Sequence, residues 1–179
     1  MTLWLKSSDF SEGDRLGERH VLSGDFGFGC DGGNLSPQLE WGGELANRAK
    51  SWAITCFDPD APTGCGFWHW LVIDIPPEMR ALDGGAGSGE GQLLPDGAVQ
   101  IRTDFGRPGY GGPCPPAGST IHRYIFSVHA LKVRELPVPR AATAAVVSAN
   151  LGWNRIGKAD LIGIYRRRGA CAGGETRDE

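Results

Sequence analysis

The sequence predicts a mainly β protein, an antiparallel β-sandwich with a peripheral helix, built as a single domain. Strand-like segments rich in aromatic and β-branched residues recur along the chain, and only one segment has the pattern of a good helix. The 28 Gly and 12 Pro among 179 residues indicate many loops. Six Trp and seven Phe provide the large apolar side chains that a core needs.

The strand candidates share aromatic and β-branched residues and are bounded by turn residues. They are residues 3–6, 51–58, 68–75, 121–132 and 160–166. Alternate residues of a strand share a face, so His122, Tyr124, Phe126 and Val128 are expected to point the same way.

One helix is expected over residues 140–151, because Pro139 suits a first-turn position and Gly152 suits the end. Residues 83–118 hold too many Gly and Pro for regular structure, which indicates a site-forming loop region. The domain is expected to span residues 1–168. Residues 169–179 have little to bury and are expected to form a flexible tail.

Charge and cysteine content limit the partners and the compartment. With 18 Lys and Arg against 21 Asp and Glu, the chain has no global field that would attract nucleic acid. No apolar run approaches the roughly 18 residues of a membrane span, and no secretion signal is recognisable. We therefore expect a cytoplasmic protein. Five cysteines without a CxxC pair favour reduced thiols over disulfides or zinc; they are Cys30, Cys56, Cys65, Cys114 and Cys171.

Two glycine patterns resemble nucleotide-binding motifs but lack their structural context. Residues 27–32 satisfy GxGxxG, yet they lead into turn residues instead of a helix. Residues 152–159 nearly spell a P-loop, but Ala159 replaces the hydroxyl residue that would hold magnesium. No nucleotide cofactor is expected.

Polar residues at strand ends indicate a small pocket. Asp58 and Asp60 alternate with prolines in a rigid acidic corner, and His122 opens a strand directly after a Gly/Pro loop. His69 lies inside an aromatic strand, where a buried structural role is the ordinary alternative. Imidazoles and loop N–H groups can donate to an anion, while carboxylates can orient the imidazoles.

Four motifs together resemble the phosphatidylethanolamine-binding protein family. They are DPDAP at 58–62, WHW at 68–70, YGGPCPP at 110–116 and HRYIF at 122–126. GGNLSPQLEW at 32–41 and the closing DLIGIYR are similar to the bacterial and archaeal branch, often labelled Raf-kinase-inhibitor-like. The resemblance implies a larger and a smaller antiparallel sheet with an anion-binding pocket at one end.

The resemblance also implies which residues line that pocket. They are Asp58, Asp60, His69, Tyr110, Gly112, Pro115, His122 and Tyr124. The two histidines would face the anion, and Asp58 would orient a histidine. The short linker 63–67 lacks the charged insertion of the animal kinase-binding members, and no covering helix follows Arg168. The pocket mouth is therefore expected to be open or closed by a second subunit, since the resemblance implies a homodimer.

The leading functional hypothesis is a regulatory protein that binds a small anion such as phosphate, phosphoethanolamine or a phospholipid head group. Two alternatives stay open: an enzyme using the Asp/His set for acid/base chemistry, and a protein-interaction module that inhibits a hydrolase or kinase. The enzyme lacks a clear nucleophile, because Ser119 and Cys114 have no evident activating partner. A metal could use Asp58, Asp60, His69 and His122, although the resemblance implies no metal or cofactor.

Overall fold

The computed structural model describes residues 2–169, which form two antiparallel sheets and one α-helix. The strands are β1 (Trp4–Lys6), β2 (Leu39–Gly42), β3 (Ser51–Asp58), β4 (Phe67–Ile75), β5 (Ala81–Leu82), β6 (Val99–Gln100), β7 (His122–Leu131) and β8 (Arg155–Tyr165). The α-helix is α1 (Ala144–Asn154), and short 3-10 helices occupy Glu18–His20, Gly24–Phe26 and Glu44–Asn47. The mainly β, antiparallel prediction is confirmed.

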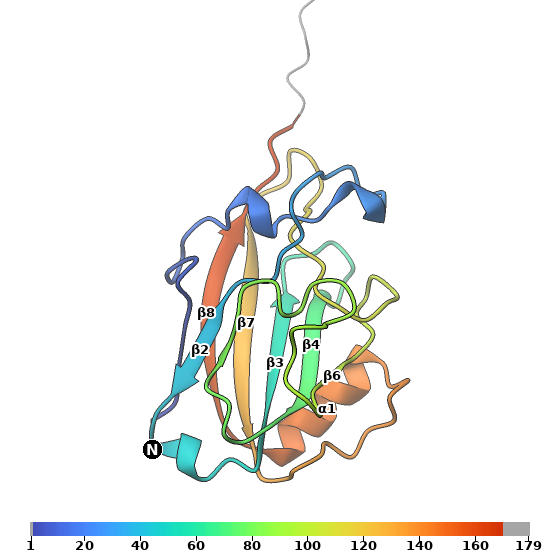
Figure 1. Ribbon diagram of the computed structural model, residues 1–179. Coiled ribbons are helices and arrows are strands. Elements are labelled where there is room, and N and C mark those ends of the chain that lie inside the picture. Colours follow the sequence, from blue (N-terminus) through green and yellow to red (C-terminus); the bar gives the residue numbers. More distant parts are fainter. Residues whose placement is uncertain (1, 170–179) are drawn as a thin grey trace, which may run out of the picture.

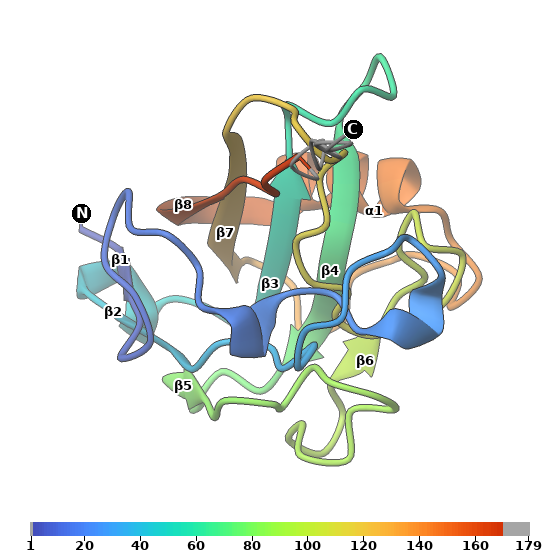
Figure 2. The ribbon, with the colours of Figure 1, turned by 90° about the horizontal axis from the view of Figure 1, so that it is seen from above.

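The two sheets and the helix form successive layers. The large sheet has the strand order β6-β4-β3-β7-β8 (Figure 1), and the small sheet has the order β1-β2-β5 (Figure 2). The small sheet lies on one side of the large sheet and α1 lies on the other (Figure 2). The central strands β3 and β7 are therefore covered on both faces, and their burial is nearly continuous.

Alternation along the central strands separates two apolar clusters. Trp52 and Ile54 of β3 and Phe126 of β7 belong to the cluster that faces the small sheet. Ala53 of β3 packs into the other cluster, against α1. The expected shared face of Tyr124, Phe126 and Val128 is confirmed, because all three lie in the first cluster.

The helix occupies a different range from the predicted 140–151. It begins after Thr143, whose hydroxyl accepts a hydrogen bond from the Val146 N–H, so the N-cap sets the helix start at Ala144, five residues after Pro139. It continues through Gly152 to Asn154. The Asn150 and Asn154 side chains donate to carbonyls one turn earlier in this last part of the helix.

Strand boundaries also differ where tertiary pairing decides them. β8 begins at Arg155 rather than at residue 160, because its whole length pairs with β7, from His122↔Tyr165 to Leu131↔Arg155. β2, β5 and β6 were not predicted. They have only two to four residues each, too few for a periodic signal.

The expectation of five reduced cysteines is wrong. Cys30 and Cys114 form a disulfide that joins two loops 84 residues apart in sequence. The sequence pattern could not reveal this pair, because cysteine spacing does not identify which loops meet. Cys56 is free and buried, Cys65 is free and exposed, and Cys171 lies outside the described residues.

The expected tail, 169–179, lies outside the described residues except for Gly169. Within residues 2–169, no helix has the length and apolar character that a membrane crossing requires.

His129 of β7 is a buried polar residue whose charge state links the fold to pH. Its Nε2 lies 3.1 Å from the Thr55 hydroxyl, and Nδ1 has no hydrogen-bond partner in the described chain. Burial, followed by the nearby Lys158 and Arg155 charges, lowers the pKa of His129 to about 3. The folded protein therefore keeps this imidazole neutral in mildly acidic solution.

We predict that the free energy of unfolding falls as the pH drops from about 6.5 towards 3, because the unfolded chain then binds a proton that folded His129 does not. Above that window both states are neutral at this residue, and it contributes no pH dependence. Within the window, the His129 contribution to the free energy of unfolding changes by up to about 1.4 kcal/mol per pH unit. Urea unfolding of the wild type and His129→Gln across this window should show a shallower slope for the variant. Parallel slopes would contradict the assignment.

Candidate functional site

A cavity of about 180 Å³ opens at one end of the large sheet. Asp58 is the last residue of β3 and His122 is the first of β7, so the antiparallel arrangement brings both to this end. The lining residues come from strand ends and loops. They are Phe28, Asp58, Ala61, Pro62, Thr63, Phe67, His69, Phe105, Cys114, Pro115, Pro116, His122 and Tyr124.

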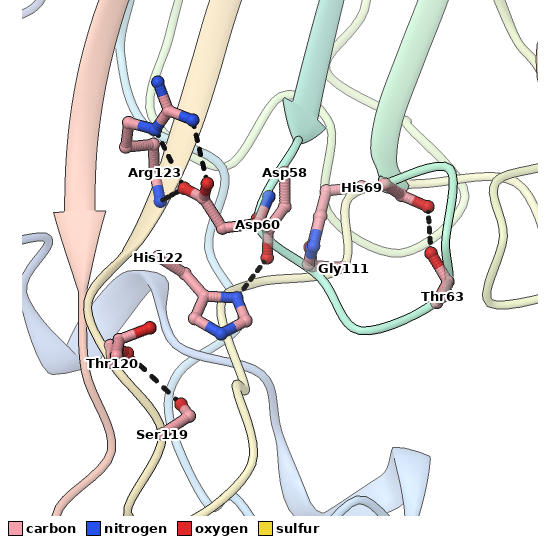
Figure 3. Close-up of polar contacts among 10 residues, drawn as sticks. Asp58, Asp60, Thr63, His69, Gly111, Ser119, Thr120, His122 and Arg123 are labelled. Carbon is pink, nitrogen blue, oxygen red and sulfur yellow. Dashed lines mark hydrogen bonds and ion pairs between the residues drawn. The ribbon is translucent and has the colours of Figure 1, made fainter.

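A buried carboxylate and imidazole form the polar centre of the cavity. Oδ2 of Asp58 lies 2.8 Å from Nδ1 of His122 (Figure 3), and both side chains are almost fully buried. The other oxygen, Oδ1, accepts the N–H of Asp60 at 2.8 Å. Asp58 thus holds the His122 ring from one side, and Nε2 of His122 lies on the side away from the carboxylate.

A β-bulge places His69 on the same side of the sheet. The β3–β4 register shifts between Cys56↔Trp70 and Phe57↔Trp68, which leaves His69 as an extra residue. Strict alternation would turn His69 away from the face of Trp70, but a bulge can redirect a side chain. The His69 ring therefore packs edge-on against Tyr124 and Phe105, at centroid distances of 5.1 and 5.3 Å.

Both imidazoles use Nδ1 for fixed hydrogen bonds. Nδ1 of His69 lies 2.7 Å from the Gly111 carbonyl oxygen, to which it donates. No hydrogen bond joins Nε2 of either His69 or His122 to another residue of the described chain. Burial lowers the pKa of His69, and this effect outweighs the opposing Gly111 carbonyl and Asp58 carboxylate. At neutral pH, His69 therefore presents a neutral Nε2 acceptor.

Two further buried groups surround Asp58. The Tyr124 hydroxyl has no hydrogen-bond partner in the described chain, and burial together with Asp58 raises the pKa of Tyr124. Burial, followed by the Asp58 charge, also raises the pKa of the Cys56 thiol. Tyr124 is therefore a neutral hydroxyl at the cavity wall, and Cys56 is not an activated nucleophile.

Asp60 does not line the cavity, contrary to the prediction. Its carboxylate forms a bidentate pair with the Arg123 guanidinium, at 2.8 Å for both Nε and Nη2, and accepts the Arg123 N–H. The guanidinium lowers the pKa of Asp60. The DPDAP turn therefore directs its two carboxylates apart, Asp58 inward and Asp60 to the surface.

Tyr110 and Gly112 also lie outside the cavity. The Tyr110 hydroxyl donates to the His20 carbonyl oxygen at 3.0 Å, and its ring packs against Trp70. Gly112 donates its N–H to Oδ1 of Asn34. A Cβ at Gly112 would lie 2.0 Å from the His20 carbonyl oxygen, so this glycine lets two loops approach closely. Both residues support the loop that carries Pro115, which does line the cavity.

The sequence motifs did not predict the aromatic side of the cavity. Phe28, Phe67 and Phe105 line it, and Phe105 contacts the other two rings at centroid distances of 5.6 and 4.8 Å. Phe67 borders the WHW motif and could have been found there. Phe28 and Phe105 come from loops without a distinguishing local pattern. The cavity thus combines a carboxylate–imidazole centre with an apolar wall.

The described residues offer little for metal or nucleophilic chemistry. Residues 2–169 contain no group of three or more His, Cys, Asp or Glu side chains placed to hold a metal ion, and Asp60 is committed to Arg123. Cys114 is held in the disulfide, and the Thr63 hydroxyl donates to the Gly66 carbonyl. The arrangement is suited to binding a ligand that exchanges hydrogen bonds with imidazole nitrogens.

Known proteins are similar to this chain over nearly the whole domain. The family model "Phosphatidylethanolamine-binding protein" matches residues 6–166. The UPF0098 protein YbhB of Escherichia coli is 45% identical over 161 residues, covering 90% of this chain and 98% of that protein. The UPF0098 protein YbcL of Escherichia coli is 46% identical over 159 residues, covering 89% and 85%. The crystal structure of YbcL has a TM-score of 0.87 at 43% identity and covers 94% of this chain and all of that chain.

The Asp58–His122 contact yields a prediction that needs no ligand. Neutral His122 should carry its proton on Nδ1, because the carboxylate accepts there. Nitrogen NMR of the histidine rings at alkaline pH should report this tautomer. Asp58→Asn should increase the other tautomer, since an amide N–H can donate to Nδ1. Asp60→Asn is the matched control and should leave the His122 signals unchanged. An unaltered tautomer in Asp58→Asn would contradict the orienting role.

Proposed function

This chain belongs to the phosphatidylethanolamine-binding protein family, and from that premise we propose that the cavity at Asp58 and His122 binds a small anion. Inorganic phosphate and the head group of a phosphate ester, such as phosphoethanolamine, have the required chemistry. The supporting observation is that Nε2 of both His69 and His122 is unpartnered while Nδ1 is held. The oxygens of a ligand can form hydrogen bonds with both of these Nε2 atoms.

The size of the cavity favours a small ligand group. Its volume of about 180 Å³ is below the roughly 300–1,000 Å³ of typical drug-sized sites. A phosphate group fits this space, and a substituent can extend along the aromatic wall or out of the mouth. Asp58, His69, Pro115, His122 and Tyr124 are the proposed ligand-binding residues, with Asp60, Tyr110 and Gly112 in supporting positions.

Charge makes binding dependent on a proton. Asp58 would repel an anion, and a neutral imidazole offers a lone pair instead of a donor at Nε2. Either an imidazole must take up a proton, or the ligand must bring one, as hydrogen phosphate does. The groups that set this balance around His69 are Asp58, Asp104, His122 and Tyr124. The anion and one proton are therefore bound together.

Binding is favoured over catalysis because the lining lacks a nucleophile next to a base. Cys114 is oxidised and the Thr63 hydroxyl is committed to a backbone carbonyl.

A regulatory role and a homodimer stay predictions, and light scattering should give twice the chain mass for the dimer. The cytoplasm was expected from the sequence, but the Cys30–Cys114 disulfide favours an oxidising compartment. Cell fractionation would distinguish the two compartments.

We predict that affinity for inorganic phosphate rises as the pH falls from about 8 towards 6, where imidazoles gain protons. The rise should continue below pH 6, because the pKa of His69 is lowered. His122→Ala should weaken binding by about 1.5–3 kcal/mol, the range for a hydrogen bond to a charged group. Calorimetric titration at several pH values measures both effects.

His129→Gln is the matched control for His122→Ala, because His129 is a buried histidine that does not line the cavity. It should bind phosphate like the wild type. An affinity that is independent of pH and unaffected by His122→Ala would reject the anion site and favour the protein-interaction hypothesis.

A further inference from the structure

Residues 23–31 form a loop that supplies one wall of the cavity through Phe28. The loop closes at its base, where the Gly32 N–H donates to the Leu22 carbonyl at 2.8 Å. Between these points no backbone–backbone hydrogen bond joins residues 23–31 to another segment of the described chain. The wall is therefore held by side-chain contacts rather than by sheet or helix structure.

Four kinds of contact hold this loop in place. The Cys30–Cys114 disulfide is the covalent one. The Arg167 guanidinium donates to the carbonyls of Phe28 and Gly29, and Phe28 packs edge-on against Phe105 at 5.6 Å. Phe26 makes the corresponding contact with Phe105 at 5.1 Å and lies under the Arg107 guanidinium. Without the disulfide, the loop is held in place by noncovalent contacts alone.

The disulfide is also part of the cavity itself. Cys114 lines the cavity beside Pro115, whereas Cys30 is buried in the core cluster. The loop that carries Cys114 is anchored independently, because Pro113 accepts the Leu22 N–H and Gly112 donates to Asn34. Opening the bond would therefore release the 23–31 loop and leave the Cys114 loop in place.

We propose that the Cys30–Cys114 disulfide is a redox latch that controls the anion cavity, a proposal that rests on the function proposed above. When the bond is closed, Phe28 is held in place as one wall of the cavity and limits the access of water to Asp58 and the two imidazoles. Charge interactions are stronger where water is excluded. When the bond is open, the wall loosens, water enters and anion affinity falls.

The switching reaction requires a dithiol as reductant. A thiolate of the dithiol attacks Sγ of Cys114, the partly exposed sulfur, and the S–S bond breaks. Sγ of Cys30 leaves as a thiolate and takes up a proton. The second thiol of the reagent then forms its own disulfide and releases Cys114 as a thiol. Two electrons pass from the dithiol to the protein, and an oxidant of the disulfide class reverses the step.

The experiment compares phosphate affinity in defined redox states. Oxidised wild type is titrated with inorganic phosphate, then again after dithiothreitol treatment and thiol counting. Affinity should fall about 3- to 10-fold on reduction, as for the loss of one aromatic contact. A Cys30→Ser, Cys114→Ser double variant should have the low affinity with or without dithiothreitol. Cys65→Ser, at an exposed free cysteine, is the control and should respond like the wild type.

Equal phosphate affinity in oxidised and fully reduced protein would overturn the latch. Hydrogen exchange gives a readout that does not depend on the ligand, because reduction should speed exchange in residues 23–31 but not in β3 or β7. If the oxidised protein fails to bind phosphate, the proposed function is rejected, and this exchange pattern still decides the latch. Loss of protection throughout the sheet on reduction would show a structural disulfide and would also overturn the latch.

Discussion

The buried carboxylate of Asp58 is the group on which the organisation of the cavity depends. It joins the ends of β3 and β7 through His122, and it fixes the following turn by accepting the Asp60 N–H. Burial, followed by the charge of Asp58, raises the pKa values of Cys56 and Tyr124, so both are protonated at neutral pH. A buried charge is tolerated only when it is hydrogen-bonded. The ring of His122 and the Asp60 N–H must therefore stay in positions from which they donate to Asp58.

The second imidazole, His69, reaches the same cavity through an irregularity in the sheet. The bulge at His69 interrupts the alternation of β4, and the Gly111 carbonyl then fixes the ring. That carbonyl is positioned by a loop whose close contact with residues 20–22 requires glycine at 112. The rigid sheet thus supplies one imidazole, while a bulge and a closely packed loop supply the other.

The large sheet separates two different polar environments. On the side of the small sheet, the strand ends form a cavity with unpartnered imidazole nitrogens. On the side of α1, Thr55 and His129 form a buried pair, and burial followed by the nearby Lys158 and Arg155 charges lowers the pKa of His129. The first arrangement leaves imidazole nitrogens for the ligand that we propose. The second links the protonation of His129 to unfolding.

The sequence by itself determined the antiparallel β class, the residue limits of β3 and the approximate limits of β4 and β7, because these long strands carry strong local patterns. Through motifs that resemble the phosphatidylethanolamine-binding protein family, it also indicated five residues that line the cavity: Asp58, His69, Pro115, His122 and Tyr124. Tertiary structure decided what local patterns do not contain: that Arg123 draws Asp60 to the surface and that Phe28 and Phe105 complete the wall. It also decided that Cys30 meets Cys114, because pairing between distant loops depends on how the whole chain packs.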